Sequence, residues 1–313
     1  MVKKHFRLRP SGERGNPEME LVVRQYGGIG NQLFQYAIGR YYAKKYGAAL
    51  RIATDTQARS MSYGHPRPPL LSNFAIAARV EQISTFERLF LSLRPPIELA
   101  TKPVRYLFKT QIIREVQPQP FTFSPDLQIR EKTRQLYLVG LWQCYPPAQL
   151  IESELRSELS FRHQPQRRNA ETALQIHAVP NSVSLHLRRG DYLTHFGSGL
   201  VLTNEYYSKA MAEMRDRFGR TTFFVFSDDK GFATQFVSNN PDCILINNNK
   251  SESAHEDLRL MSLCKNHIIA NSTFSWWGAW LNCRTTKVVI APKQWLGVDT
   301  ATVELLPSSW IRI

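Results

Sequence analysis

The sequence lacks the features that mark several large classes of protein. It has only four cysteines, Cys144, Cys243, Cys264 and Cys283, and they form no CxxC pair and no Cys/His pair at zinc-site spacing. No apolar run approaches the roughly 20 residues of a membrane-spanning helix, and the N-terminal segment has no apolar core of the kind found in a secretory signal. We therefore expect reduced thiols and a cytoplasmic chain that reaches a membrane only by docking on it.

Acidic residues are scarce relative to basic ones. Lys and Arg number 40 and Asp and Glu 26, which gives a net charge of +14. Such an excess fits nucleic acid, an anionic membrane surface or a phosphorylated substrate as a partner. The basic residues form no dense runs interleaved with aromatics, and no RNP, KH or helix-turn-helix signature occurs. We therefore predict no nucleic-acid partner, and we keep peripheral contact with the inner membrane face as a hypothesis.

Several short catalytic motifs are also missing. There is no GxxxxGK[ST] phosphate loop, no HExxH and no GxSxG. The turn at residues 27–30 (GGIG) resembles a dinucleotide-binding loop only loosely, because no small residue completes the GxGxxG pattern. A P-loop kinase is therefore disfavoured.

What is present in the first half is the start of an α/β fold. Residues 1–20 are predicted to be a flexible basic tail. An apolar run at 20–25, the glycine turn and a helical pattern at 31–46 predict strand, turn and helix, and 49–52 predicts a second strand. Residues 61–126 show no clean periodicity, so we expect loops and short helices there. A strand at 136–141 and a helix at 146–159 close this half.

The second half alternates strands and helices more clearly. A polar stretch at 162–168 indicates a linker, with a domain boundary near 162–180. Beyond it, strands are predicted at 182–187, 221–226, 243–246, 267–270 and 287–291, and helices at 204–218, 231–238, 256–264 and 274–282. This spacing predicts a doubly wound parallel sheet. The expected organisation is thus a tail (1–20), an N-terminal domain (21–165) and a C-terminal domain (178–313).

Polar clusters follow three of these strands, where ligands of parallel sheets bind. They are HLRRGDY (186–192), FSDD (226–229) and NSTFSWW (271–277). Adjacent arginines are suited to gripping a diphosphate, because each guanidinium offers paired donors in fixed geometry. A helix opening at Ser272-Thr273 would present free amides to an anion. Each cluster also has a structural interpretation: a surface ion pair, a helix cap, or a tryptophan pair in the core.

Together these clusters resemble one family. The segments GGIGNQLFQYAIGRYYAKKYG (27–47), HLRRGDY, FSDD and DLRLMSLCKNHIIANSTFSWWGAWLN (257–282) are similar to those of the α-1,2-fucosyltransferases of glycosyltransferase family 11. The resemblance implies inverting transfer of L-fucose from GDP-β-L-fucose to a sugar hydroxyl, commonly the 2-hydroxyl of a terminal galactose. It implies a GT-B-like fold with two Rossmann-type domains, the C-terminal one binding the GDP-sugar and the N-terminal one facing the acceptor. No metal is expected.

The resemblance and the residue chemistry together indicate a site. Loss of fucose leaves negative charge on GDP, and without a DxD element the Arg188 and Arg189 cations are the expected stabilisers, so Arg189→Ala should nearly abolish transfer. Candidates for the general base are His186, Asp191, Asp257 and His267, of which His186 and Asp191 join the arginines in the catalytic set. The predicted donor-binding residues are Gly28, Gly30, Asn31, Gln32, Arg189, Ser227, Asp229, Asn271, Ser272, Thr273 and Phe274, with Asp229 a candidate for the guanosine.

Other interpretations remain open at this stage. The chain could use another GDP-sugar or make another fucosyl linkage, and nucleic-acid binding is a remote alternative. Residues 55–130 should carry much of the acceptor site and show only fragments of resemblance, such as LSNFAI (71–76). The acceptor, the linkage and the oligomeric state are not readable from the sequence.

Overall fold

A computed structural model describes residues 19–57, 67–92, 103, 106, 109–115, 121–195 and 198–313. The predicted tail at 1–20 therefore lies almost entirely outside the described residues. All four cysteines are free, and three of them are buried, as the expectation of reduced thiols requires. Within the described ranges, no helix has both the length and the apolar character to cross a bilayer.

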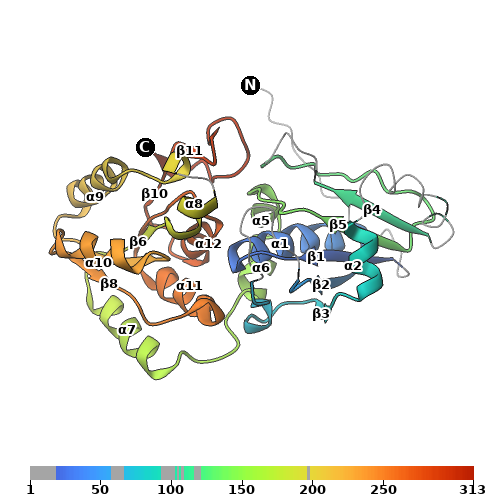
Figure 1. Ribbon diagram of the computed structural model, residues 1–313, viewed down its shortest axis with the longest axis horizontal. Coiled ribbons are helices and arrows are strands. Elements are labelled where there is room, and N and C mark those ends of the chain that lie inside the picture. The colour runs from blue at the N-terminus through green and yellow to red at the C-terminus, as the bar shows by residue number, and fades with distance from the viewer. Residues whose placement is uncertain are drawn as a thin grey trace.

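The first half forms a parallel five-stranded sheet in the order β3-β2-β1-β5-β4 (Figure 1). Its strands are β1 (Glu20–Gln25), β2 (Ala49–Thr54), β3 (Arg79–Gln82), β4 (Thr110–Arg114) and β5 (Gln135–Val139). Side chains alternate between the two faces of a strand. Leu21 and Val23 accordingly join the core under α1 (Ile29–Tyr46), whereas Val22 joins a smaller core with Leu91 of α2 (Thr85–Ser92).

Two strands of this sheet occur where loops and short helices were predicted. β3 and β4 are the two edge strands, and α2 between them is one of the expected short helices. β3 is only four residues long and exposed throughout, so its sequence RVEQ carries no buried stripe that a periodicity could reveal. β3 is therefore a strand because it pairs with β2, and not because its own sequence favours one.

The second half forms a parallel six-stranded sheet in the order β13-β10-β9-β6-β7-β8. Its strands are β6 (Ser182–Leu187), β7 (Thr222–Ser227), β8 (Cys243–Leu245), β9 (Asn266–Ile268), β10 (Val289–Ala291) and β13 (Ile311–Arg312). Around it lie α8 (Gly190–His195), α9 (Asn204–Phe218), α10 (Lys230–Ser238), α11 (Ala254–Leu263) and α12 (Thr273–Leu281), and β11 (Gln294–Trp295) pairs with β12 (Val298–Asp299) as a separate ribbon. The doubly wound prediction is confirmed.

The segment between the sheets is more helical than predicted. The helix expected at 146–159 is divided at Ile151 into α5 (Pro146–Leu150) and α6 (Glu152–Glu158), because Ile151 leaves the helical conformation. Residues after the polar stretch form α7 (Arg167–Ala178), which packs against α11. Ile176 and two buried polar side chains give α7 a narrow inner face, too sparse to stand out in the sequence.

The two halves meet along α1 and α12 (Figure 1). The Phe34 ring lies 4.6 Å from that of Trp276 and 5.1 Å from that of Trp277, measured between centroids. Both tryptophans are fully buried, so the structural interpretation of this pair, as core, holds. Burial of large rings at this interface fixes the first residues of α1 against the first residues of α12.

Candidate active site

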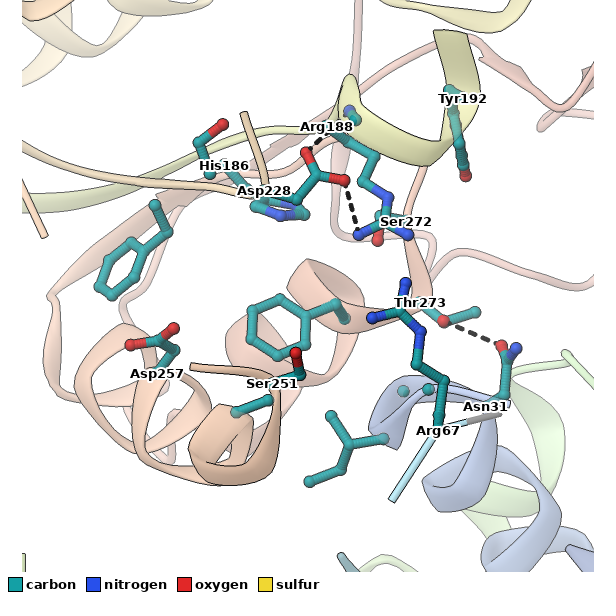
Figure 2. A pocket seen from close by; sticks show the side chains of 18 of the residues that line it. Asn31, Arg67, His186, Arg188, Tyr192, Asp228, Ser251, Asp257, Ser272 and Thr273 are labelled. Carbon is teal, nitrogen blue, oxygen red and sulfur yellow. Dashed lines mark hydrogen bonds and ion pairs between the residues drawn. The ribbon is translucent and has the colours of Figure 1, made fainter. Parts of the chain in front are cut away.

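A cavity of about 640 Å³ lies between the two sheets and takes its walls from both halves (Figure 2). In the second sheet the chain order reverses at one place, between β6 and β9. Crevices at such positions, outside the carboxyl ends of the strands, are where open α/β sheets bind ligands. Arg188 and Asn271, which follow β6 and β9, line the cavity, and so do Gly28 and Gln143, which follow β1 and β5.

Arg188 is the member of the arginine pair that lines the cavity. Its Nη1 lies 3.0 Å from Oδ2 of Asp228, which also accepts from the backbone N–H groups of Arg189 and Gly190. Burial raises the pKa of Asp228, but Arg188 and these amides outweigh burial and lower it overall. The carboxylate therefore stays ionised and holds Arg188 in place.

Arg189 and Asp229 lie outside the cavity lining. The Arg189 guanidinium carbon is 3.9 Å from the centroid of the Phe232 ring, and its Nε is 3.6 Å from Asp229 Oδ2. Asp229 caps α10, accepting from the backbone N–H of Phe232 at 3.0 Å. Both residues thus have structural contacts in this conformation. Ser227 does line the cavity, and its hydroxyl donates to the Leu187 carbonyl at 2.9 Å.

The histidines proposed as bases differ in position. His186 lines the cavity, with Nδ1 3.0 Å from the Ser275 hydroxyl, and burial together with the Arg188 charge lowers its pKa to about 3. It is neutral at pH 7 and holds a proton weakly, so it is better suited to hydrogen bonding than to general base catalysis. His267 is buried away from the cavity between Ser184 and Asn282. The side chain of Asp191 lies outside the described part of the structure.

The first residues of α12 form one wall. Thr273 Oγ1 donates to Asn31 Oδ1 at 3.0 Å, and Gln143 Nε2 donates to the same oxygen at 2.9 Å. Ser272 is the N-cap residue and makes no side-chain cap bond. The first amides of a helix have no intrahelical partner, so this wall offers N–H donors to an anion. Asn271, Ser272 and Phe274, which the sequence analysis assigns to the donor, line the cavity beside Thr273.

The glycine turn of the first half approaches α12 very closely. A Cβ on Gly30 would lie 2.5 Å from the Thr273 carbonyl carbon and 2.6 Å from the Phe274 nitrogen. Only glycine fits this contact, which brings Gly28, Gly30 and Asn31 into the lining. Gln32 lies behind the turn, where it donates to the Gly27 and Pro68 carbonyls and accepts from the Leu70 amide.

Sequence reasoning missed several residues of the lining. Arg67 of the first half and Arg188 of the second point toward the same region above Thr273 (Figure 2). No motif signalled Arg67. Lys230 directly follows FSDD, and residues 249–252 (NKSE) form a loop before α11. Guanidinium groups from opposite walls are suited to binding an anion in this region.

Asp257 lies at the other side of the cavity, on α11. Burial raises its pKa to about 6, although Asn249 Nδ2 donates to its Oδ1 at 2.7 Å and acts in the opposite direction. The sequence singled out Asp257 only as a base candidate. In the described ranges, no group of three or more His, Cys, Asp and Glu side chains is arranged to hold a metal ion.

Comparisons with known proteins identify the family of the chain. Residues 106–308 match the model of Glycosyl transferase family 11. The chain is 31% identical to the Escherichia coli O-antigen biosynthesis glycosyltransferase WbnK, over 92% of this chain and 98% of that protein, and 28% identical to an E. coli alpha-1,2-colitosyltransferase, over 94% and 98%. The solved structure of an Arabidopsis thaliana FUT1 mutant in complex with GDP aligns with a TM-score of 0.52 at 12% identity, over 87% of this chain and 70% of that one, in keeping with a GT-B-like fold. The chain belongs to glycosyltransferase family 11.

Proposed function

We propose that this enzyme transfers L-fucose from GDP-β-L-fucose to the 2-hydroxyl of a terminal galactoside. The proposed donor is supported by one observation: Arg67 and Arg188 converge at the first turn of α12. Paired guanidinium donors and helix-terminal amides together form a site for a diphosphate, and they stabilise the charge that develops on GDP as the fucosyl bond breaks.

The guanine base is assigned to the end of the cavity that holds Asp257. Guanine presents two adjacent donors, N1–H and N2–H₂, and a carboxylate is the side chain that accepts both. Asp257 lines the cavity, and the bond from Asn249 fixes its orientation. Asp229, the sequence-based candidate, is occupied in capping α10. With guanine at Asp257 and the diphosphate at Arg188, the sugar extends toward Asn31 and the first sheet.

In the proposed reaction the acceptor oxygen attacks the anomeric carbon on the face opposite the diphosphate. The carbon–oxygen bond to phosphate breaks, its electron pair leaves with GDP, and the configuration inverts. Bond breaking runs ahead of bond making in an oxocarbenium-like transition state, so the acceptor proton is lost late and a weak base suffices, for which water is enough. The cations and amides supply the charge stabilisation that other transferases draw from a divalent metal.

A second donor is favoured by one observation. The relative that is 28% identical over 94% of this chain is an alpha-1,2-colitosyltransferase. Another deoxy sugar carried on GDP would use the same base and diphosphate contacts and differ only at the sugar end of the cavity. GDP-colitose is therefore the alternative donor.

The deciding experiment is calorimetric titration with GDP-fucose in excess EDTA, with GDP-mannose and a short RNA as competitors. We expect saturable binding that neither competitor reduces, followed by transfer to lactose or phenyl β-galactoside detected by mass spectrometry. Binding that needs a divalent metal would contradict the assigned diphosphate contacts. Binding and transfer with GDP-colitose, and none with GDP-fucose, would replace the donor.

A further inference from the structure

Several residues at the carboxyl edge of the first sheet take no part in the donor contacts. β1 and β5 are neighbours in this sheet, and the residues that follow them are Tyr26-Gly27-Gly28 and Gly140-Leu141-Trp142-Gln143. Gly28 and Gln143 line the donor cavity. Tyr26 and Trp142 are close to them in the chain, and we call this part of the sheet the β1–β5 edge.

A carboxylate and an indole lie close together at this edge. Glu115 follows β4, and its Oε2 accepts from the backbone N–H of Leu141 at 2.7 Å. A Cβ on Gly140 would lie 2.8 Å from that Oε2 and 3.0 Å from Trp142 Nε1, so the absence of a side chain at Gly140 lets the two polar atoms come together. Burial raises the pKa of Glu115, and burial followed by the Glu115 charge raises that of Tyr26 to about 12.

Trp142 has two features that folding alone does not explain. Its φ is +55°, a backbone conformation that is costly for a residue with a bulky side chain. Its Nε1–H is buried with no hydrogen-bond partner, although a buried donor normally has one. Trp142 thus combines backbone strain with an unpaired buried donor, and it lies next to a residue of the cavity lining. This combination indicates that the residue serves in ligand binding.

We propose that Glu115 and Trp142 form the binding subsite for the acceptor sugar, with Glu115 accepting from one sugar hydroxyl and the Trp142 indole N–H donating to another oxygen. Sugars present donors and acceptors on one small rigid ring, and a carboxylate beside an indole N–H matches both. Glu115, Trp142 and Tyr26 are each partly exposed, whereas the Trp142 Nε1–H itself is buried, so a sugar reaches this N–H only when the indole ring turns. This proposal rests on the proposed function, because that function makes the acceptor a sugar hydroxyl.

The position also connects the subsite with the donor. Trp142 precedes Gln143, whose amide binds Asn31, which in turn binds Thr273 at the start of α12. An acceptor held on Trp142 would therefore lie beside the part of the cavity assigned to the donor sugar. Gln35 links the two sides of the β1–β5 edge, accepting from the Tyr26 amide and donating to the Gly140 carbonyl.

The test compares Glu115→Gln and Trp142→Phe with two control variants. Glu158→Gln alters a half-buried carboxylate that binds Tyr36 and Arg40, and Trp310→Phe alters an indole packed on Trp276, both outside the cavity lining. With GDP-fucose and phenyl β-galactoside, we expect the acceptor KM to rise roughly tenfold or more for Glu115→Gln and roughly three- to tenfold for Trp142→Phe. The donor KM and the controls should stay within about twofold, since neither group contacts the donor.

A second readout separates this subsite from the proposed function. In ¹⁵N-tryptophan-labelled protein, the indole N–H signal absent from Trp142→Phe identifies Trp142, and methyl galactoside, N-acetylgalactosaminide and glucoside are added to the GDP complex. At least one glycoside should shift that signal and leave the Trp310 signal in place. An acceptor KM unchanged in both variants, or a Trp142 signal that no glycoside moves, would overturn the subsite. Failure of wild-type transfer with a Trp142 shift intact would overturn only the donor or the reaction.

Discussion

At the scale of single residues, the two adjacent arginines have different roles. Arg188 lines the cavity and is held by Asp228, while Arg189 packs on Phe232. Arg188→Lys should reduce kcat/KM by roughly 10²–10³-fold, because lysine cannot reproduce a paired guanidinium contact to phosphate. The loss of kcat/KM in Arg189→Lys should be at least tenfold smaller. Equal losses, with both variants folded by circular dichroism, would restore Arg189 as the principal cation.

The sequence could not separate these two arginines. Both follow a buried strand directly, and which of them turns into the cavity depends on the exact residue at which β6 ends and α8 begins. Asp228 decides this by accepting from the amides of Arg189 and Gly190, a tertiary contact with no local signal. Ser272 and Thr273 differ from the arginines because their position at the start of a helix follows from the local sequence pattern. Their place in the fold could therefore be predicted.

Asp257 gives donor binding a pH dependence. Its pKa near 6 means that the carboxylate is ionised above that pH and accepts from both guanine donors, whereas below it the protonated form loses one acceptor. GDP-fucose affinity measured by calorimetry should therefore fall from pH 7 to pH 5. Asp257→Asn should bind more weakly and show a flatter profile, and Asp242→Asn, outside the cavity lining, should follow the wild type. If the affinity of Asp257→Asn for GDP-fucose depends on pH as steeply as that of the wild type, Asp257 does not bind the guanine base.

The same group affects folding with the opposite sign. In the unfolded chain an Asp ionises near pH 3.9, and in the folded protein only near 6. Between these values the folded state binds more protons, so the contribution of Asp257 to stability declines as pH rises through this window. Binding of a donor that favours the carboxylate offsets this decline.

At the scale of elements, the contact between α1 and α12 depends on Gly30. Gly30→Ala places a Cβ 2.5 Å from the Thr273 carbonyl carbon, so the two helices must separate. We expect a loss of about 1–3 kcal/mol in the free energy of unfolding, typical of overpacking, and weaker GDP-fucose binding. Gly28→Ala is the control for stability, since its Cβ would meet nothing within 4 Å. Equal denaturation midpoints for the two variants would contradict the close approach.

The cap of α10 gives a separate test of Asp229. Asp229→Ala should cost about 0.5–2 kcal/mol of stability, because the Phe232 amide loses its acceptor. Asp229→Asn keeps a capping oxygen and should unfold close to the wild-type midpoint, with GDP-fucose affinity little changed. Urea denaturation and calorimetry measure the two effects. Wild-type stability combined with a large affinity loss in Asp229→Asn would return the guanosine contact to Asp229.

Elements with a buried stripe could be predicted from the sequence, and elements made by pairing could not. β1, α1, β6 and α12 have buried apolar residues that define their extent. β3 and α7 have few or none, and they exist because β2 and α11 offer them a partner. The contact at the β1–β5 edge was missed for the same reason: Glu115 and Trp142 come together only once β4 pairs with β5.

At the scale of the whole molecule, the net charge of +14 predicts binding to anionic membranes. Each basic residue near such a surface contributes about 1 kcal/mol at low salt. The protein should therefore pellet with phosphatidylglycerol vesicles at low ionic strength and be released near 1 M salt, where the screening length is only about 3 Å. Neutral phosphatidylcholine vesicles are the control. A protein that stays in the supernatant with anionic vesicles at low salt has no such affinity.

The Gln143–Asn31–Thr273 chain of hydrogen bonds joins the β1–β5 edge of the first sheet to the start of α12 at the donor cavity. Because Asn31 accepts both bonds through a single oxygen, we expect a shift of either partner to alter the other. A ligand bound at one of these places should then change the free energy of binding at the other. Thermodynamic linkage makes this coupling reciprocal, so whatever factor the sugar nucleotide adds to acceptor affinity, the acceptor must return to the sugar nucleotide.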